Sequence, residues 1–200
     1  AQTIAFAPQR EAWLHKAAEN MPRLIETEKR PCRVVVSRPD SLAFQGWTMD
    51  EAGDMASLYG ESFKARREAI VDFGEHTTGY FSFSMDTDTD SDAPLRFRLT
   101  FAEVPSELNT PFDPYPGSLS RAWLQDEVVT VMRLPAEVTV PRRVAFRYVK
   151  IEMLAHSSFD FRITDMRCRA VTSASGEVPA LVPGTDPRIR RIHDVGLVTL

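Results

Sequence analysis

The segment that follows residue 102 holds the side chains best suited to recognising a sugar. Phe112, Tyr115 and Trp123 supply aromatic rings, and Asp113 and Arg121 stand among them. Aromatic faces cover the apolar C–H patches of a sugar ring, while charged groups hydrogen-bond its hydroxyls. The same five residues are equally suited to plugging against a neighbouring domain. We favour this plug and keep the carbohydrate site as the alternative.

Cleavage of a glycosidic bond generally requires two opposed carboxyl groups, an acid and a base or nucleophile, at a defined separation. The linear sequence shows no such pair facing across a cleft, so we read the available carboxylates as surface charge and assign no catalytic residue. The candidates that we considered are Glu75, Glu103, Asp113, Asp126 and Glu127.

Other chemistries find little support in the sequence. Four aspartates alternate from Asp86 to Asp92, but the EF-hand pattern fails, because its glycine position is Ser91 and its last glutamate position is Phe97. Asp72-Phe-Gly74 resembles the magnesium motif of kinases without the other kinase motifs, so it predicts only a strand end with a glycine turn. The histidines stand singly and no nucleotide or serine-hydrolase motif is present, so we expect no metal and no cofactor.

The charge of the chain disfavours two classes of binding partner. The net charge of -4 disfavours nucleic acid and anionic membranes, which attract clustered cations.

Cys32 and Cys168 are far apart and lack metal-ligand spacing, so we predict two buried thiols rather than a disulfide framework. No apolar run is long enough to span a bilayer, and no signal peptide is visible. The compartment stays open, with the cytoplasm slightly favoured.

Alternating apolar residues predict a mainly β fold. Leu95 to Phe101 and Gly79 to Met85 each alternate with period two, which predicts an antiparallel pair joined by residues 86–94 and covered by a second sheet. Near Asp165 the apolar positions change parity, which predicts a β-bulge. Roughly seven short strands with turn residues between them indicate an antiparallel β-sandwich, jelly-roll-like, with short flanking helices. The further strands are predicted at 33–37, 61–67, 123–134, 137–140, 144–154 and 159–170.

Helical patterns lie mainly toward the two ends of the chain. We predict a short amphipathic helix over residues 8–20, and the capping-box pattern Thr48 to Glu51 predicts another helix running through Leu58. Asp186-Pro187 begins an apolar helix without a stop signal. The chain thus divides into a lead segment (1–60), a sandwich (61–172), a linker (173–185) and a helix (186–200) that is expected to belong to a following domain.

Several stretches, taken in order, resemble the region ahead of the catalytic barrel in α-L-rhamnosidases of glycoside hydrolase family 78. The resemblance covers about residues 66–200 and leaves the opening third unplaced. It is carried by Val71-Asp-Phe-Gly-Glu75 through Thr78-Gly-Tyr80, Leu95 to Glu103, Pro111-Phe-Asp-Pro-Tyr-Pro-Gly117 through Trp123-Leu-Gln-Asp-Glu127, Phe146-Arg-Tyr-Val-Lys-Ile-Glu152, and Asp186-Pro187 through Arg191-Ile192.

The resemblance implies a non-catalytic accessory β-sandwich. In that family an (α/α)6 barrel follows the sandwich and carries the inverting acid and base, so no catalytic residue transfers to this chain. The helix from Asp186 resembles the first barrel helix. The implied partner is therefore the barrel, contacted through the segment Glu103 to Arg121 and through the final helix, with carbohydrate as a further candidate. The alternative is an autonomous carbohydrate-binding module. A third interpretation is an independent small enzyme, which would require two spatially paired carboxylates in a pocket.

Overall fold

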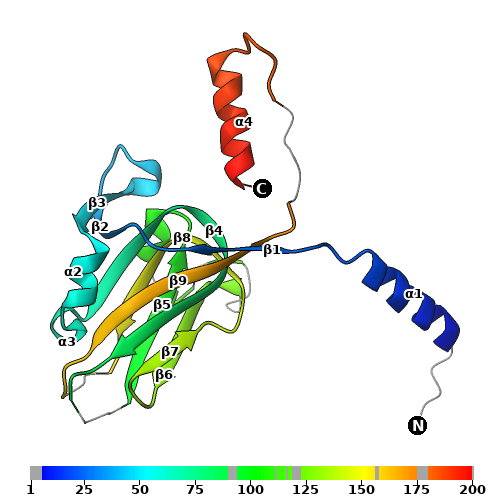
Figure 1. Cartoon of the computed structure of the whole chain (residues 1–200). Coiled ribbons are helices and arrows are strands. Elements are labelled where there is room, and N and C mark those ends of the chain that lie inside the picture. The colour runs from blue at the N-terminus through cyan, green and yellow to red at the C-terminus, as the bar shows by residue number, and fades with distance from the viewer. Residues whose placement is uncertain are drawn as a thin grey trace.

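The structure is a computed structural model that describes residues 6–89, 94–110, 112–115, 117–118, 123–155, 158–174 and 180–199. It is mainly β and antiparallel with a few short helices, as the sequence predicted (Figure 1). The helices are α1 (Ala7–Glu19), α2 (Met55–Gly60), α3 (Phe63–Arg66) and α4 (Pro187–Thr199), with the 3-10 turns η1 (Phe44–Gly46) and η2 (Pro105–Leu108). The strands are β1 (Ile25–Lys29), β2 (Arg33–Pro39), β3 (Trp47–Gly53), β4 (Glu68–Asp86), β5 (Leu95–Ala102), β6 (Asp126–Val131), β7 (Ala136–Thr139), β8 (Val144–Met153) and β9 (Arg162–Thr172).

The 19-residue strand β4 belongs to both layers of the sandwich. Its first half pairs with β2 and β8, and its second half pairs with β9 and β7. One layer therefore runs β3-β2-β4-β8-β5-β6 and the other runs β1-β9-β4-β7. Strands β1, β2 and β3 come from the first 60 residues, so these residues share the sheet with the rest of the chain.

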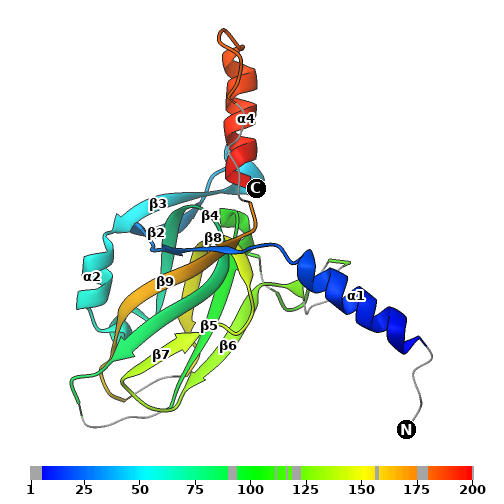
Figure 2. The same cartoon turned by 45° about the vertical axis from the view of Figure 1, so that its right-hand side comes forward.

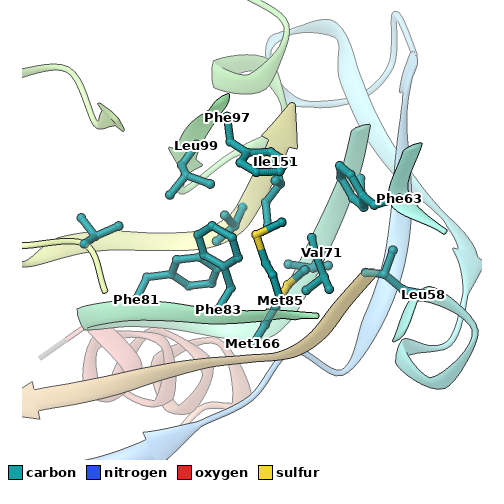
Figure 3. Packing of buried hydrophobic residues seen from close by; sticks show 14 of the residues in the cluster. Leu58, Phe63, Val71, Phe81, Phe83, Met85, Phe97, Leu99, Ile151 and Met166 are labelled. Atoms are coloured by element: carbon teal, nitrogen blue, oxygen red, sulfur yellow. The ribbon is translucent and has the colours of Figure 1, made fainter. Parts of the chain in front are cut away.

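The core is a continuous cluster of aromatic and aliphatic side chains between the two layers (Figure 3). Phe81 and Phe83 of β4 are fully buried and face β5. The ring centroid of Phe83 lies 6.1 Å from that of Phe97, and the centroid of Phe81 lies 5.5 Å from that of Phe101. The predicted hairpin of β4 and β5 is therefore wrong, because the two strands pack face to face and hydrogen-bond to other strands. The second sheet that the pattern required is nevertheless present.

Two local irregularities adapt β4 and β9 to each other. The pairing register shifts where Ser84 faces Asp165 and Met85 faces Ile163, which confirms the bulge predicted near Asp165. Gly79 lies so close to β9 that a Cβ at this position would sit 2.2 Å from the carbonyl oxygen of Arg169. A side chain would not fit there, so glycine is required by the close approach of two backbones.

The Asp72-Phe-Gly74 motif lies inside β4 rather than at a strand end, which corrects the prediction. Phe73 packs in the core, and Gly74 adopts a φ of 80° where the register with β8 shifts. The Asp72 carboxylate is fully buried and accepts hydrogen bonds from Arg33 and Arg147 at 2.8–3.1 Å and from the Gly74 N–H at 2.7 Å. Burial opposes ionisation of this carboxyl, but the hydrogen bonds from Arg147 and Arg33 outweigh it and lower the pKa of Asp72.

Two predictions between residues 48 and 67 are wrong. The capping-box pattern at Thr48 to Glu51 lies within strand β3, and the helix that follows is α2, whose first turn is capped by Asp54 through the N–H of Ser57 at 2.7 Å. The predicted edge strand at 61–67 contains helix α3 instead. Its Phe63 is buried in the core, and the Phe63 N–H donates to the carbonyl of Phe161.

Helices α1 and α4 both extend away from the sandwich (Figures 1 and 2). Both were predicted. Helix α4 exposes Ile189, Ile192 and Val195, and its last turn returns to the sandwich, where Leu197 lines a hollow with Glu75 and His76 of β4. None of the described helices is long and apolar enough to cross a membrane.

The two cysteines have different surroundings, and neither forms a disulfide. Cys168 is fully buried, and this burial raises the pKa of its thiol to about 12. Cys32 is exposed, so the prediction that it is buried is wrong. Its position explains the exposure, because it immediately precedes β2 beside the irregular turn at Gly74.

Candidate functional site

The connection between β5 and β6 carries the predicted site residues, and its first half is held by side-chain hydrogen bonds. The carboxylate of Glu107 accepts from the backbone N–H groups of Glu103 and Val104 at 2.7 and 3.4 Å, which fixes the start of η2. The Asn109 amide donates to the carbonyl of Pro105 and accepts from the Ser37 hydroxyl of β2 at 2.9 Å. The turn is thus attached to the sandwich by contacts far apart in sequence.

The second half of the connection is fixed at the point where it enters β6. The Gln125 amide donates to the carbonyl of Ala145 at 2.8 Å and accepts from the Ala145 N–H at 2.7 Å. Arg142 donates to the carbonyls of Leu124 and Asp126 and forms an ion pair with Glu127. Both ends of the connection are therefore anchored to the sheet.

The anchored connection encloses an aromatic hollow of about 410 Å³. Phe112, Tyr115 and Trp123 all line this hollow, so three of the five predicted site residues come together there. Trp123 remains 76% exposed, which leaves a large apolar surface at the rim. Further lining residues are Gln45, Phe101, Ser106, Glu107, Thr110, Gly117, Leu124 and Gln125. A hollow of this volume suits a small ligand or a protruding side chain from another domain.

The remaining two predicted residues are not in the aromatic hollow. Asp113 lines a second, polar hollow of about 390 Å³ that shares Phe112 with the aromatic hollow, and Arg121 lies outside the described residues. The polar hollow also contains Arg98 and Lys150, which form ion pairs with Glu152 and Glu68 at 3.7 and 3.2 Å. Because these cations already have partners, the hollow presents mixed charge rather than a site for one sign of ligand.

Of the five carboxylates considered for catalysis, Asp113 and Asp126 both line the polar hollow, and the other three have a basic neighbour. Glu75 forms an ion pair with Lys29 at 2.5 Å, Glu103 lies 3.5 Å from His76, and Glu127 pairs with Arg142. In the part of the chain that the structure describes, no three His, Cys, Asp or Glu side chains are grouped so that they could hold a metal ion. The described residues thus offer binding surfaces, and we assign no catalytic pair of acid and base among them.

Sequence reasoning missed two residues that shape the site. Gln45 enters the aromatic hollow from the turn before β3, where its φ is 53° and its amide oxygen accepts from the Ser106 hydroxyl. Gln125 lies in the stretch Trp123 to Glu127 that resembles the rhamnosidase family, but the sequence did not mark it as a site residue. Its side-chain amide hydrogen-bonds the backbone of Ala145 and so attaches the loop to β8. Gly46 in the short Phe44–Gly46 turn was an available signal of unusual backbone, but nothing local connects that turn with residue 106.

The fold and the site together define a β-sandwich domain with an aromatic hollow at one connection and two helices that extend from its body. The model of the glycosyl hydrolase family 78 alpha-rhamnosidase N-terminal domain matches residues 31–170. The chain belongs to this family. No curated protein sequence matches it.

Two solved structures are similar to the chain. A rhamnosidase from Klebsiella oxytoca with rhamnose bound is 37% identical, with a TM-score of 0.87 over 95% of this chain and 37% of that protein. A family 78 rhamnosidase of Bacillus sp. GL1 is 16% identical, with a TM-score of 0.41 over 55% of this chain and 10% of that protein. The chain thus spans little more than a third of the length of the Klebsiella relative.

Proposed function

We propose that this chain is the non-catalytic accessory N-terminal domain of an α-L-rhamnosidase-like glycoside hydrolase. The main support is the match to the Klebsiella oxytoca rhamnosidase, which takes in 95% of this chain but only 37% of that protein. Three of the five candidate carboxylates have a basic neighbour, which is consistent with chemistry located elsewhere, because an inverting glycosidase needs an acid and a base facing each other. Those two carboxylates would then belong to a following (α/α)6 barrel.

Helix α4 is the natural connection to that barrel. Its N-terminus is capped by the Asp186 carboxylate, which accepts from the Arg188 N–H at 2.8 Å. Its side chains Ile189, Ile192 and Val195 are 54%, 73% and 55% exposed, although apolar helix faces are normally covered. We assign α4 as the first helix of the barrel, so that its exposed face becomes part of the barrel's core.

The aromatic hollow offers a second contact with the barrel and borders the sugar cleft in this proposal. Trp123 exposes its large ring at the rim, while Phe112 and Tyr115 are half-buried and held by the anchored connection. Exposed aromatic residues on a well-anchored support are typical of interface anchors, because they bury much area with little loss of side-chain freedom. The plug interpretation therefore remains the one that we favour.

Autonomous carbohydrate binding is the second candidate function. It is favoured by one observation, that three aromatic side chains line a single hollow of about 410 Å³. Such a hollow is within the size range of small-molecule pockets. The polar hollow beside it is lined by Asp113, and a carboxylate is a group that hydrogen-bonds sugar hydroxyls.

A pair of activity measurements tests the main proposal. The 200-residue chain is expected not to cleave a nitrophenyl α-L-rhamnoside, whereas the full-length protein cleaves it. Cleavage by the 200-residue chain alone would overturn the accessory role, and an inactive full-length protein would remove the rhamnosidase assignment.

A glycan titration separates the scaffold from the binding module. Saturable binding that is lost in Trp123→Ala and Tyr115→Ala but retained in Trp13→Ala supports the module. Trp13 is a suitable control because it is an equally exposed tryptophan on α1, 67% against 76% for Trp123. No binding by the wild-type chain supports the scaffold.

A further inference from the structure

Helix α1 exposes two large apolar side chains that the described part of the chain does not cover. None of its 13 residues is buried. Trp13 and Leu14 are 67% and 58% exposed, and Met21, just beyond the helix, is 73% exposed. These residues recur at helical spacing and form one apolar stripe with Ala17 and Ala18. A helix of this length is marginal by itself in water, so contact with another body is needed to keep it folded.

The opposite face of α1 is polar and already internally paired. His15 lies 3.4 Å from Glu19 one turn later, and Lys16 stands in the last turn, where a cation is favoured by the helix dipole. This face is suited to solvent. The helix is thus two-sided, with one face for water and one for a partner.

The position of α1 indicates which body it contacts. In the pairing of β1 with β9, Ile25 lies opposite Thr172. The segment that enters β1 and the segment that leaves β9 therefore meet at the same edge of the sheet. Helix α1 precedes the first segment and α4 follows the second, and both extend beyond the sandwich in two views (Figures 1 and 2). A domain that includes α4 would therefore be joined to the sandwich at the same sheet edge from which the chain leads to α1.

The similarity to the Klebsiella oxytoca rhamnosidase extends to these outlying segments. The match takes in 95% of this chain, so it reaches beyond the sandwich into the segments that carry α1 and α4. That protein continues well beyond the matched region, since the match takes in 37% of its length. The relative thus has ample chain outside the matched region for the further domain that the proposed function supplies.

We infer that α1 is a docking helix whose stripe of Trp13, Leu14 and Met21 packs on the domain that follows α4. The inference rests on the proposed function, because that function supplies the following domain. The sandwich would then hold its neighbour from two places, by a direct connection through α4 and by a separate apolar contact through α1. Trp13 is the expected anchor, since a large, fully covered aromatic side chain usually dominates such a contact.

Hydrogen exchange of the full-length protein tests this inference. The amides of residues 7–19 are expected to exchange at least about 100-fold more slowly than in an unfolded chain, because a covered helix opens rarely. The double variant Trp13→Ala/Leu14→Ala should lose most of this protection while β4 and β9 keep theirs. The control Leu42→Ala removes an apolar side chain that is 96% exposed on the turn before β3, and it should leave α1 protected.

Three results would overturn the inference. Unprotected α1 amides in the wild-type protein would show that nothing covers the helix. Unchanged protection in the double variant would show that the stripe is not the contact. Protection that disappears along a dilution series, together with a change from dimer to monomer in light scattering, would assign the helix to a second copy of the chain. Each result is independent of rhamnoside cleavage, which tests the proposed function separately.

Discussion

Replacing Asp72 by alanine tests the central ion cluster of the sandwich. The Asp72 carboxylate is fully buried and accepts five hydrogen bonds, two from Arg33, two from Arg147 and one from the N–H of Gly74. Removing one partner of a buried ion pair typically costs about 3–5 kcal/mol, because the remaining charge loses its compensation. Here the Arg33 and Arg147 side chains are 40% and 35% exposed, so water partly replaces the lost partner. We therefore expect a loss at the lower end, about 3 kcal/mol.

The loss is measurable by thermal unfolding of the 200-residue chain followed by circular dichroism. For a domain of this size, about 3 kcal/mol corresponds to a fall in Tm of about 6–12 °C. The control is Asp88→Ala, because the Asp88 side chain is 74% exposed and its ion pair with Arg162 is at the surface. That variant should unfold at the wild-type midpoint. Equal midpoints for the Asp72 and Asp88 variants would refute the reasoning.

The same carboxylate predicts a pH dependence of stability. Although burial opposes ionisation, the hydrogen bonds from Arg147 and Arg33 lower the pKa of Asp72 in the folded state. A lowered folded pKa contributes stability above the unfolded pKa of about 3.9, and this contribution is lost as the pH falls toward the folded pKa. The difference in stability between wild type and Asp72→Asn should therefore be constant near neutral pH and shrink below about pH 4. A difference that is equally large at low pH would contradict the assignment.

Two further substitutions or modifications follow from packing. Gly79→Ala places a Cβ 2.2 Å from the Arg169 carbonyl oxygen and should lower the free energy of unfolding in urea by about 2–3 kcal/mol. The control Gly196→Ala, whose Cβ would meet no atom within 4 Å, should leave the stability unchanged or raise it slightly. Equal unfolding midpoints for the two variants would contradict the close approach of the backbones at Gly79. Iodoacetamide at mildly alkaline pH should label the exposed Cys32 much faster than Cys168, because burial raises the pKa of the Cys168 thiol to about 12. Mass spectrometry that finds equal labelling would show that Cys168 is accessible.

Patterns of period two predicted the faces of the strands well but not their partners. Phe81 and Phe97 were both expected to face inward, and both are fully buried. Their strands were expected to pair because they are consecutive, yet β4 pairs with β8 and β9 instead. Alternation records which side of a strand is apolar, whereas the choice of neighbour depends on contacts far apart in sequence. The bulge at Asp165 was predictable because a change of parity is visible within the strand itself.

The candidate site was predictable to the extent that it is local. Phe112, Tyr115 and Trp123 lie within twelve residues of one another and line one hollow. Asp113 is adjacent in sequence but lines the other hollow, because side-chain directions in an irregular loop have no fixed period. Gln45 comes from a turn about sixty residues earlier, and only the folded sheet brings it to Ser106. Non-local neighbours of this kind are the part that the sequence did not reveal.

The shared strand β4 has a consequence for how the domain opens. Its first half is hydrogen-bonded into one layer and its second half into the other, with no described break in the strand between them. If either layer separated from the other, β4 would lose the hydrogen-bonded partners of half its length. The phenylalanine side chains that pack between the two layers would then be exposed. The two layers should consequently melt in a single all-or-none transition, with slow amides in β8 and β9 exchanging through the same global event.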